Sequence, residues 1–180
     1  MGLAKEKNEP EQWRKKMRKI SKEELASILA NHKLWLESKS AEGRAASLSG
    51  FDLRGVDLYN ADLRFADLRG ADLRDADLRG ARLNEAWMNG AELSLANLRD
   101  ADLRGAHLNG ADLNGADLMY AKLGNADLRG ADLAAADFLF TELQGTNLNG
   151  AALNGAALHW SDLSKASLQG ADLSGVRRGA

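Results

Sequence analysis

The chain contains no cysteine, and only one of its 180 residues is proline. Without cysteine it has neither a disulfide scaffold nor thiol chemistry. Its three histidines, His32, His107 and His159, are scattered, and no HExxH motif or paired-histidine spacing is present. Structural and catalytic zinc sites need such clusters. Asp recurs by rule in the repeat, so no Ser-His-Asp arrangement can be argued from it. We therefore expect a protein that is not an enzyme and that holds no metal and no cofactor.

Long apolar runs are also missing. No stretch approaches the roughly 20 apolar residues that a membrane-spanning helix needs. The first residues include Lys5, Glu6, Lys7 and Glu9, where a secretory signal peptide would carry its apolar core. These observations favour a cytoplasmic protein without a membrane contact.

The chain instead consists largely of one five-residue motif, Ala-Asp-Leu-Arg-Gly, which occurs in varied form 26 times between residues 46 and 175. The middle residue, here called the centre, is Leu in 24 of the 26 units, and Met88 and Phe138 take the other two places. Two positions before the centre, 21 of the 26 residues are Ala. A fixed short period of this kind indicates a repeat architecture.

A period of five fits neither a straight helix nor a flat strand, because the apolar centres would not stay on one face. Each unit must therefore contain a bend. Two positions after the centre, 14 of the 26 residues are Gly, and Asn60, Asp75, Asp100 and Asn125 occupy the same position in other units. These residue types tolerate the positive φ that the third residue of a type II turn requires. The pattern predicts short extended pieces joined by turns, with the centres and the small residues pointing inward.

The repeat resembles the pentapeptide-repeat family, whose motif is Ala-Asp/Asn-Leu-any-any. The resemblance covers residues 46–175 and implies an all-β solenoid, a right-handed quadrilateral β-helix with four units per coil. The 26 units would then form 6.5 coils, with residues twenty apart stacked on one another. At about 4.8 Å per coil the rod would be roughly 30 Å long.

Four segments are expected: a disordered tail (1–9), a helical N-terminal extension and cap (10–44), the β-helix (45–175) and a C-terminal tail (176–180). Pro10 suits the start of a first helix, and Trp13, Met17 and Ile20 would share one of its faces. The opposite face is basic, which suits either a solvated helix face or contact with an anionic surface or a nucleic acid.

A second helix is predicted from Lys22 to Glu37, because Ser21 and Glu24 form a capping box. A solenoid needs a cap over its terminal coil. We expect this helix to cover the first coil, with Trp35 and Leu36 buried near Phe51. His32 lies on the apolar stripe of the helix and is expected to pack there rather than to bind a ligand.

Charge is distributed unevenly. Residues 1–44 hold 11 basic and 7 acidic residues, whereas residues 45–175 hold 11 basic and 19 acidic residues. The acidic rod disfavours direct nucleic-acid binding. One predicted face carries an acidic column at twenty-residue spacing, Asp72, Glu92, Asp112 and Asp132. Like charges in register repel one another. This column therefore suits either a basic partner or ordinary carboxylates that bond to nearby turns.

Another predicted corner carries apolar and aromatic pairs at the same spacing, which are Met119 and Tyr120, Leu139 and Phe140, and His159 and Trp160. Exposed aromatic patches are typical of contact surfaces, although neighbouring rings also pack on one another. The C-terminal tail, residues 176–180, is too short to form a second cap helix. We expect a homodimer joined through the C-terminal half, by the end coil, the aromatic residues, or both.

Two functions remain open from the sequence. The first is a non-enzymatic scaffold or protein-protein interaction module that presents rigid faces to an unidentified protein partner. The alternative is a DNA-mimicking regulator: the family resemblance implies that some members occupy the DNA-binding saddle of DNA gyrase and protect it from inhibitors. The acidic rod fits that alternative, but its first part, residues 46–105, has 11 acidic residues diluted by 8 arginines.

Overall fold

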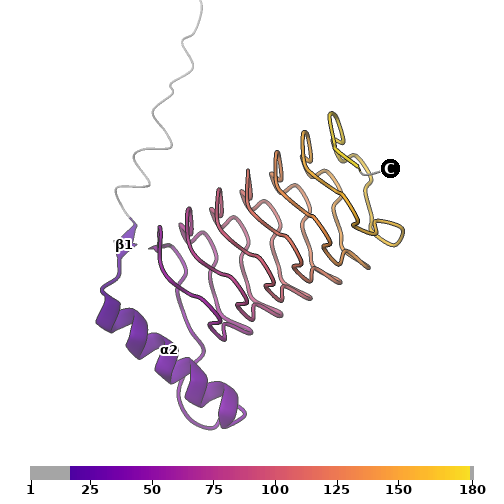
Figure 1. Cartoon of the computed structure of the whole chain (residues 1–180). Coiled ribbons are helices and arrows are strands. Elements are labelled where there is room, and N and C mark those ends of the chain that lie inside the picture. Colours follow the sequence, from indigo (N-terminus) through magenta and orange to yellow (C-terminus); the bar gives the residue numbers. More distant parts are fainter. Residues whose placement is uncertain (1–16, 179–180) are drawn as a thin grey trace, which may run out of the picture.

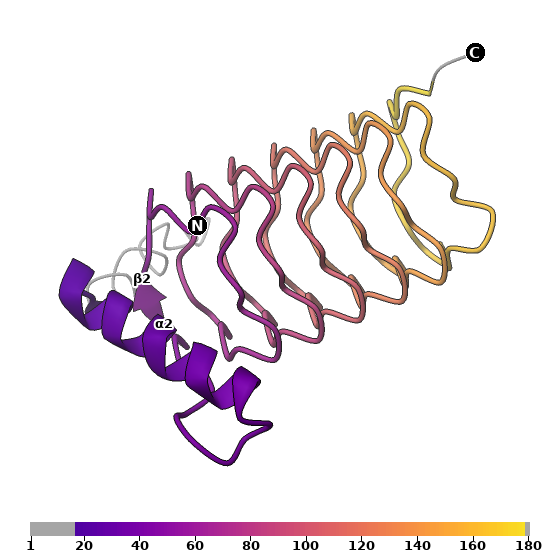
Figure 2. The same ribbon diagram turned by 60° about the horizontal axis from the view of Figure 1, so that its bottom comes forward.

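The computed structural model describes residues 17–178. Backbone bridges join residues twenty apart, from Ser47 with Asp67 to Ala157 with Arg177, and all of them are parallel. Each coil therefore contains four five-residue units, and the coils stack into the right-handed quadrilateral β-helix seen in Figure 1 and, turned, in Figure 2. The predicted tail 1–9, and the part of the predicted first helix around Pro10 and Trp13, lie outside the described residues.

The core is a column of Leu centres with a layer of Ala beside it. Leu98 and Leu103 are fully buried, as are Met88 and Phe138, which replace Leu. Burial of each Leu is worth roughly 1.5–3 kcal/mol before chain entropy is subtracted. The prediction that every centre and every residue two positions before it is buried is wrong at both ends of the rod. Near the cap, Val56 and Ala61 are only half-buried. In the last coil, three centres and the small residues before them are half-buried because no described coil lies over them; the centres are Leu163, Leu168 and Leu173.

The turns follow the predicted chemistry. In the unit centred on Leu68, the N–H of Ala71 donates to the carbonyl of Leu68 at 3.1 Å, and Gly70 between them has φ +59°. The residue two positions after the centre has positive φ in every unit except the one that ends at Lys165. Phe65, Leu95 and several other large residues adopt this backbone as well. They do so against a steric cost of about 1–2 kcal/mol each.

The N-terminal helix α2 spans Lys22–Glu37, the predicted range, and the Ser21 hydroxyl accepts from the N–H of Glu24 at 3.0 Å. Its buried residues are Leu25 and His32. Trp35 and Leu36 are only half-buried, so their predicted burial near Phe51 is wrong. The helix docks further round the coil, where Trp35 meets the ring of Phe65 edge-on at 6.3 Å between centroids. Figure 2 shows α2 at the N-terminal end of the rod, against the first coil.

A short strand before the helix pairs with a short strand of the first coil. Strand β1, Arg18–Lys19, runs parallel to β2, Phe51–Asp52, and extends the ladder of that face by one position. The guanidinium of Arg18 lies 4.7 Å from the centre of the Phe51 ring. The predicted first helix is therefore wrong for residues 18–19, because pairing with β2 offers their backbone a partner that an isolated helix end does not.

The cap is also joined to the rod through His32. Its Nδ1 accepts from the N–H of Ala46, the first small residue of the repeat, at 3.0 Å. The connection between them turns at Gly43, whose φ is +71°. A side chain at Gly43 would collide with the carbonyl oxygen of Asn31, so glycine is required there for space as well as for backbone conformation.

Candidate binding surfaces

The outer faces of the first half of the rod carry pairs of an Asp and the Arg two residues after it. In the unit around Leu103, Asp102 Oδ1 accepts from the backbone N–H and the Nε of Arg104, and Asp102 Oδ2 accepts from an Arg104 terminal nitrogen at 2.6 Å. This hydrogen-bonded arginine lowers the pKa of Asp102 to about 2. We call this pair, an Asp that accepts from both Nε and a terminal nitrogen of the Arg two residues later, an arginine fork. It recurs in six further units, those of Asp52, Asp62, Asp67, Asp72, Asp77 and Asp127.

The predicted acidic column forms as expected: bridges connect Asp72 with Glu92, Glu92 with Asp112, and Asp112 with Asp132. Its first half is neutralised by interleaved arginines. Arg54 Nε lies 3.6 Å from Asp72, and Arg74 Nε lies 3.3 Å from Glu92. Asp72 is buried beneath these side chains rather than pointing out to solvent.

The second half of the column has a different environment. Asp112 accepts from the N–H of Asn114 at 2.9 Å and from the Ser94 hydroxyl at 2.7 Å, and Asp132 accepts from the N–H of Ala134 at 2.9 Å. Within residues 17–178 neither carboxylate has an ion-pair partner within 4.0 Å. The carboxylates thus bond to their own turns, and within residues 17–178 no ion pair offsets the charge of the later two. A basic partner for this column stays a prediction.

We call Tyr120, Phe140 and Trp160 the aromatic stripe. The rings of Tyr120 and Phe140 stack with centroids 5.3 Å apart, and those of Phe140 and Trp160 stack at 6.3 Å. Tyr120 and Phe140 remain 44% exposed and Trp160 remains 69% exposed. All three residues have positive φ at the glycine position of their turns. The rings therefore pack on one another and still present a large exposed surface.

The other three predicted interface residues, Met119, Leu139 and His159, lie beside the stripe and are half-buried. Met119 Sδ accepts from an Arg99 terminal nitrogen at 2.7 Å, and Asp137 Oδ1 accepts from the N–H of Leu139 at 3.0 Å. The structure thus brings the six predicted residues to one corner of the rod, in two adjacent columns.

A groove of about 440 Å³ opens next to the stripe, and we call it the side groove. Phe140, Trp160, Glu142 and Asp162 line it, with Leu143, Gln144 and Arg104 among its other walls. It lies where the ladder between the last coils departs from its regular form. The N–H of Gly145 donates to the carbonyl of Lys165 at 3.2 Å, one residue beyond the acceptor expected from the other coils, and Lys165 does not adopt positive φ.

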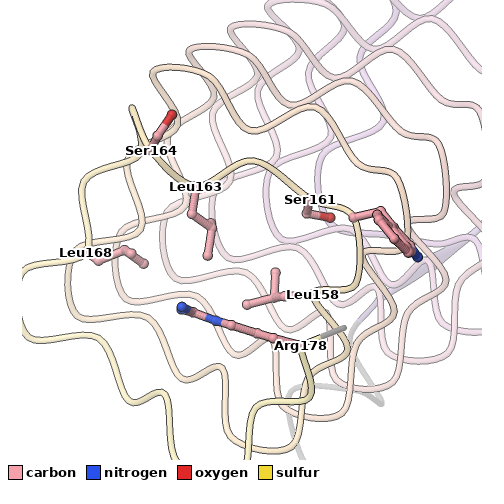
Figure 3. A pocket seen from close by; sticks show the side chains of 7 residues that line it. Leu158, Ser161, Leu163, Ser164, Leu168 and Arg178 are labelled. Atoms are coloured by element: carbon pink, nitrogen blue, oxygen red, sulfur yellow. The ribbon is translucent and has the colours of Figure 1, made fainter. Parts of the chain in front are cut away.

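A second hollow, of about 560 Å³, lies at the end of the rod, and we call it the end hollow. Leu158, Leu163 and Leu168 project into the last coil there, and Arg178 lies across its mouth (Figure 3). Figures 1 and 2 show that, among the described residues, no helix covers this end as α2 covers the other.

Sequence reasoning missed two aromatic contacts. Trp87 and His107 stack at 4.1 Å between ring centroids, and Phe65 holds the cap through Trp35. Trp87 and His107 are twenty residues apart, so the repeat spacing alone could have predicted that they stack. The second depends on where α2 crosses the coil, which the repeat does not encode.

Within residues 17–178 no helix is long and apolar enough to cross a membrane. The same residues contain no group of three or more histidine, cysteine or acidic side chains suited to hold a metal ion. The surfaces that we consider as candidate sites are the aromatic stripe with its side groove, the acidic column and the end hollow; a further hollow of about 580 Å³ lies between α2 and the first coil.

Comparison with known proteins gives a consistent result. The family model described as pentapeptide repeats matches the chain in eight copies, over residues 44–75, 76–115, 96–134, 112–150 and 141–177. Among solved structures, Rfr23, a pentapeptide repeat protein from the cyanobacterium Cyanothece, is 26% identical over 84% of this chain and 99% of its own, with a TM-score of 0.51. A search of the curated proteins found no significant match.

Two further solved structures are similar. HetL, a pentapeptide repeat protein involved in heterocyst differentiation regulation from the cyanobacterium Nostoc, is 32% identical over 74% of this chain and 77% of its own, with a TM-score of 0.39. A trypsin-treated variant of QnrB1, a plasmid-mediated fluoroquinolone resistance protein, is 23% identical over 74% of this chain and 77% of its own, with a TM-score of 0.59. The latter likeness concerns the fold alone.

Proposed function

Since this chain belongs to the pentapeptide repeat family, we propose that it works as a non-enzymatic interaction module, which presents one rigid corner of its β-helix to a partner protein. Proteins of this family are generally structural or interaction proteins rather than enzymes. Function must be argued from a site and not from the fold. The surface that we assign to the partner is the aromatic stripe.

The observation that supports this assignment is the position of the three rings. Each occupies a left-handed turn residue that glycine would fill without strain, so the backbone disfavours them there. They contribute little to the core, since Trp160 is 69% exposed. Strained, exposed aromatic residues are characteristic of contact surfaces. Phe65 gives an internal precedent, because this ring has the same backbone and is the one on which Trp35 of the cap docks.

The test is affinity capture from lysate with the full chain, followed by mass spectrometry. We compare the wild type with Phe140→Ser/Trp160→Ser and with the control Trp87→Ser, which removes an exposed ring from a different face. A partner retained by the wild type and the control, but lost from the double variant, is the expected result. Identical sets of captured proteins for all three would contradict a binding role of the stripe.

We further propose that two copies associate through the end hollow. Its half-buried Leu163 and Leu168 leave apolar surface in contact with water, which is unfavourable. Pairing about a two-fold axis would cover this surface on both copies at once. This proposal assigns self-association to the end coil, where Trp160 also lines the hollow, and leaves Tyr120 and Phe140 of the aromatic stripe free for another protein.

DNA mimicry remains a second candidate, favoured by the uncompensated charge of Asp112 and Asp132. The neutralised first half of the column limits the face that such a mimic would present. A gyrase supercoiling assay with and without a quinolone tests it. If the candidate is correct, Asp112→Asn/Asp132→Asn abolishes the effect and added salt weakens it. Absence of any effect of the wild type at high micromolar concentration removes it.

A further inference from the structure

The corner that carries the aromatic stripe already binds cations of its own chain. The guanidinium of Arg79 lies 5.4 Å from the ring centre of Tyr59, and that of Arg99 lies 6.0 Å from the ring centre of Tyr120. In both pairs the arginine comes from the column just before the stripe, at positions equivalent to Met119 and Leu139. Attraction between a cation and the face of an aromatic ring is the physical basis of such pairs.

Closer to the C-terminus, the same corner no longer carries arginine at these positions. The positions equivalent to Arg79 and Arg99 become Leu139 and His159, an uncharged side chain and a weak base. Among the described residues no arginine or lysine lies over the ring of Phe140 or Trp160. Two strongly exposed rings thus lack the partner that the earlier rings of the corner have.

The carboxylates near these rings have cations in their surroundings but, among the described residues, none in direct contact: the charge of Arg104, which also lines the side groove, acts on Glu142, and that of Lys165 acts on Asp162. Glu142 and Asp162 are paired in register by the ladder, so their like charges lie on neighbouring coils. Within residues 17–178 neither forms an ion pair within 4.0 Å. Asp162 accepts from the backbone N–H of Ser164 at 2.9 Å and also hydrogen-bonds the Ser164 side chain. Of the seven arginine forks, only that of Asp127 lies in the later part of the rod, where residues 106–175 hold 8 acidic and 3 basic residues.

The side groove brings the two sets together. Phe140 and Trp160 lie along it with Glu142 and Asp162, in a space of about 440 Å³. Clefts of a few hundred Å³ are of the size that receives a side chain or a small ligand. Rings and carboxylates around one space attract the same kind of group, a cation with an apolar stem, which is the chemistry of lysine and arginine side chains.

We propose that the side groove and the aromatic stripe bind a lysine- or arginine-rich segment of a partner protein. A cationic head lies between Glu142 and Asp162, and its stem packs on the rings of Phe140 and Trp160. The segment takes the role that Arg79 and Arg99 play for Tyr59 and Tyr120. This inference rests on the proposed protein-binding function and adds the chemistry of the partner.

The test uses the full chain and a fluorescently labelled twelve-residue peptide of alternating arginine and serine, with binding followed by fluorescence anisotropy. Peptides in which citrulline or glutamate replaces every arginine are the chemical controls. We expect binding of the arginine peptide alone, weakened by added salt. Glu142→Gln/Asp162→Asn and Phe140→Ser/Trp160→Ser should each weaken it by about ten-fold, as expected for loss of charge-assisted and ring contacts at a partly enclosed site.

The matched control is Asp112→Asn/Asp132→Asn. It changes the net charge by the same amount as Glu142→Gln/Asp162→Asn, but it lies on a different column of the rod. Affinity within about two-fold of the wild type is expected for this control, since neither Asp112 nor Asp132 lines the groove and salt screens charges on another face of the rod. Equal losses in both charge variants would show general attraction to an acidic rod and would overturn the proposal.

The remaining outcomes separate this inference from the function on which it rests. No binding of the arginine peptide at millimolar concentration and low salt overturns the inference. So does equal binding of the citrulline peptide, or sedimentation showing that a second copy covers the stripe. A partner captured through the stripe that lacks a basic segment would overturn the inference and leave the proposed interaction function standing. Loss of stripe-dependent capture together with loss of peptide binding would overturn both.

Discussion

The cost of a side chain on this rod depends on its place within the five-residue unit. Leu98 is a centre and is fully buried, whereas Leu95, three residues earlier, is 64% exposed and has φ +59°. The same residue type therefore stabilises at one position and strains the backbone at the other. Position within the unit is a better guide to the effect of a substitution than hydrophobicity alone.

This contrast gives a first prediction. Leu95→Asn should raise the free energy of unfolding by about 0.5–1 kcal/mol, because asparagine tolerates the left-handed conformation. Leu98→Ala should lower it by about 2–5 kcal/mol, because it leaves a cavity in the core. Urea unfolding followed by circular dichroism measures both. A destabilising Leu95→Asn would mean that the exposed Leu has contacts that outweigh its strain.

The arginine forks give a second prediction, on pH. The pKa of Asp102 is about 2, below the value of about 3.9 for an unfolded chain. A lowered folded pKa contributes stability above the unfolded value, and this contribution is lost as the pH falls from about 4 towards 2. Asp102→Asn should therefore lower the melting temperature by a few degrees at pH 7, with screening by solvent keeping the effect small. The difference should vanish near pH 2.

Asp132→Asn is the matched control for this experiment. Asp132 accepts from a backbone N–H, and no arginine pairs with it among residues 17–178. Its substitution should change the melting temperature less than Asp102→Asn does at pH 7. A pH-independent difference for Asp102→Asn would show that the fork contributes through shape rather than charge.

At the scale of elements, the cap is held by a contact that titrates. His32 is fully buried, and its Nδ1 must be unprotonated to accept from the N–H of Ala46. Burial lowers the pKa of His32. The nearby carboxylate of Asp62 and a hydrogen bond to the backbone of Arg64 oppose this effect, and the positive charge of Arg64 adds to it. Since the folded pKa is the lower one, the stabilisation is present above the unfolded pKa of about 6.5 and is lost as the pH falls below it.

We therefore predict that α2 loosens in mild acid before the rod does. Amide hydrogen exchange of Lys22–Glu37 should become faster relative to the central coils as the pH falls from 7 to 5, after correction for intrinsic rates. In His32→Asn the side-chain oxygen can still accept from Ala46 but does not titrate, so the relative protection should become independent of pH. An unchanged pH dependence in this variant would rule out His32 as the cause.

Elements differ in how far the sequence specifies them. The twenty-residue spacing was enough to place Tyr120, Phe140 and Trp160 in one stack, and the capping box was enough to place α2. The burial of Asp72 was not predictable, because it depends on where the side chains of Arg54 and Arg74 lie. Strand β1 was missed for a related reason: two residues become a strand only when β2 is there to pair with them.

At the scale of the whole molecule, the two ends of the rod differ. The first coil is covered by α2, whereas the last described coil has half-buried Leu centres around the end hollow. We predict a dimer in sedimentation equilibrium and its dissociation by Leu163→Ser/Leu168→Ser, which makes the hollow polar. Tyr120→Asp/Phe140→Asp should leave the dimer intact, because neither residue lines the end hollow. A wild type that stays monomeric at high concentration would refute the end-to-end dimer.

The backbone ladder has a mechanical consequence. Its hydrogen bonds, such as that from the N–H of Leu68 to the carbonyl of Trp87, join one coil to the next and so run along the axis of the rod. A force that pulls the two ends of the chain apart acts on these bonds one coil at a time. Each coil that peels away would release roughly 3.3 Å per residue of slack chain. Under tension the molecule should therefore lengthen in steps of equal size, one for each coil, beginning at the less buried C-terminal end, which is yellow in Figure 1.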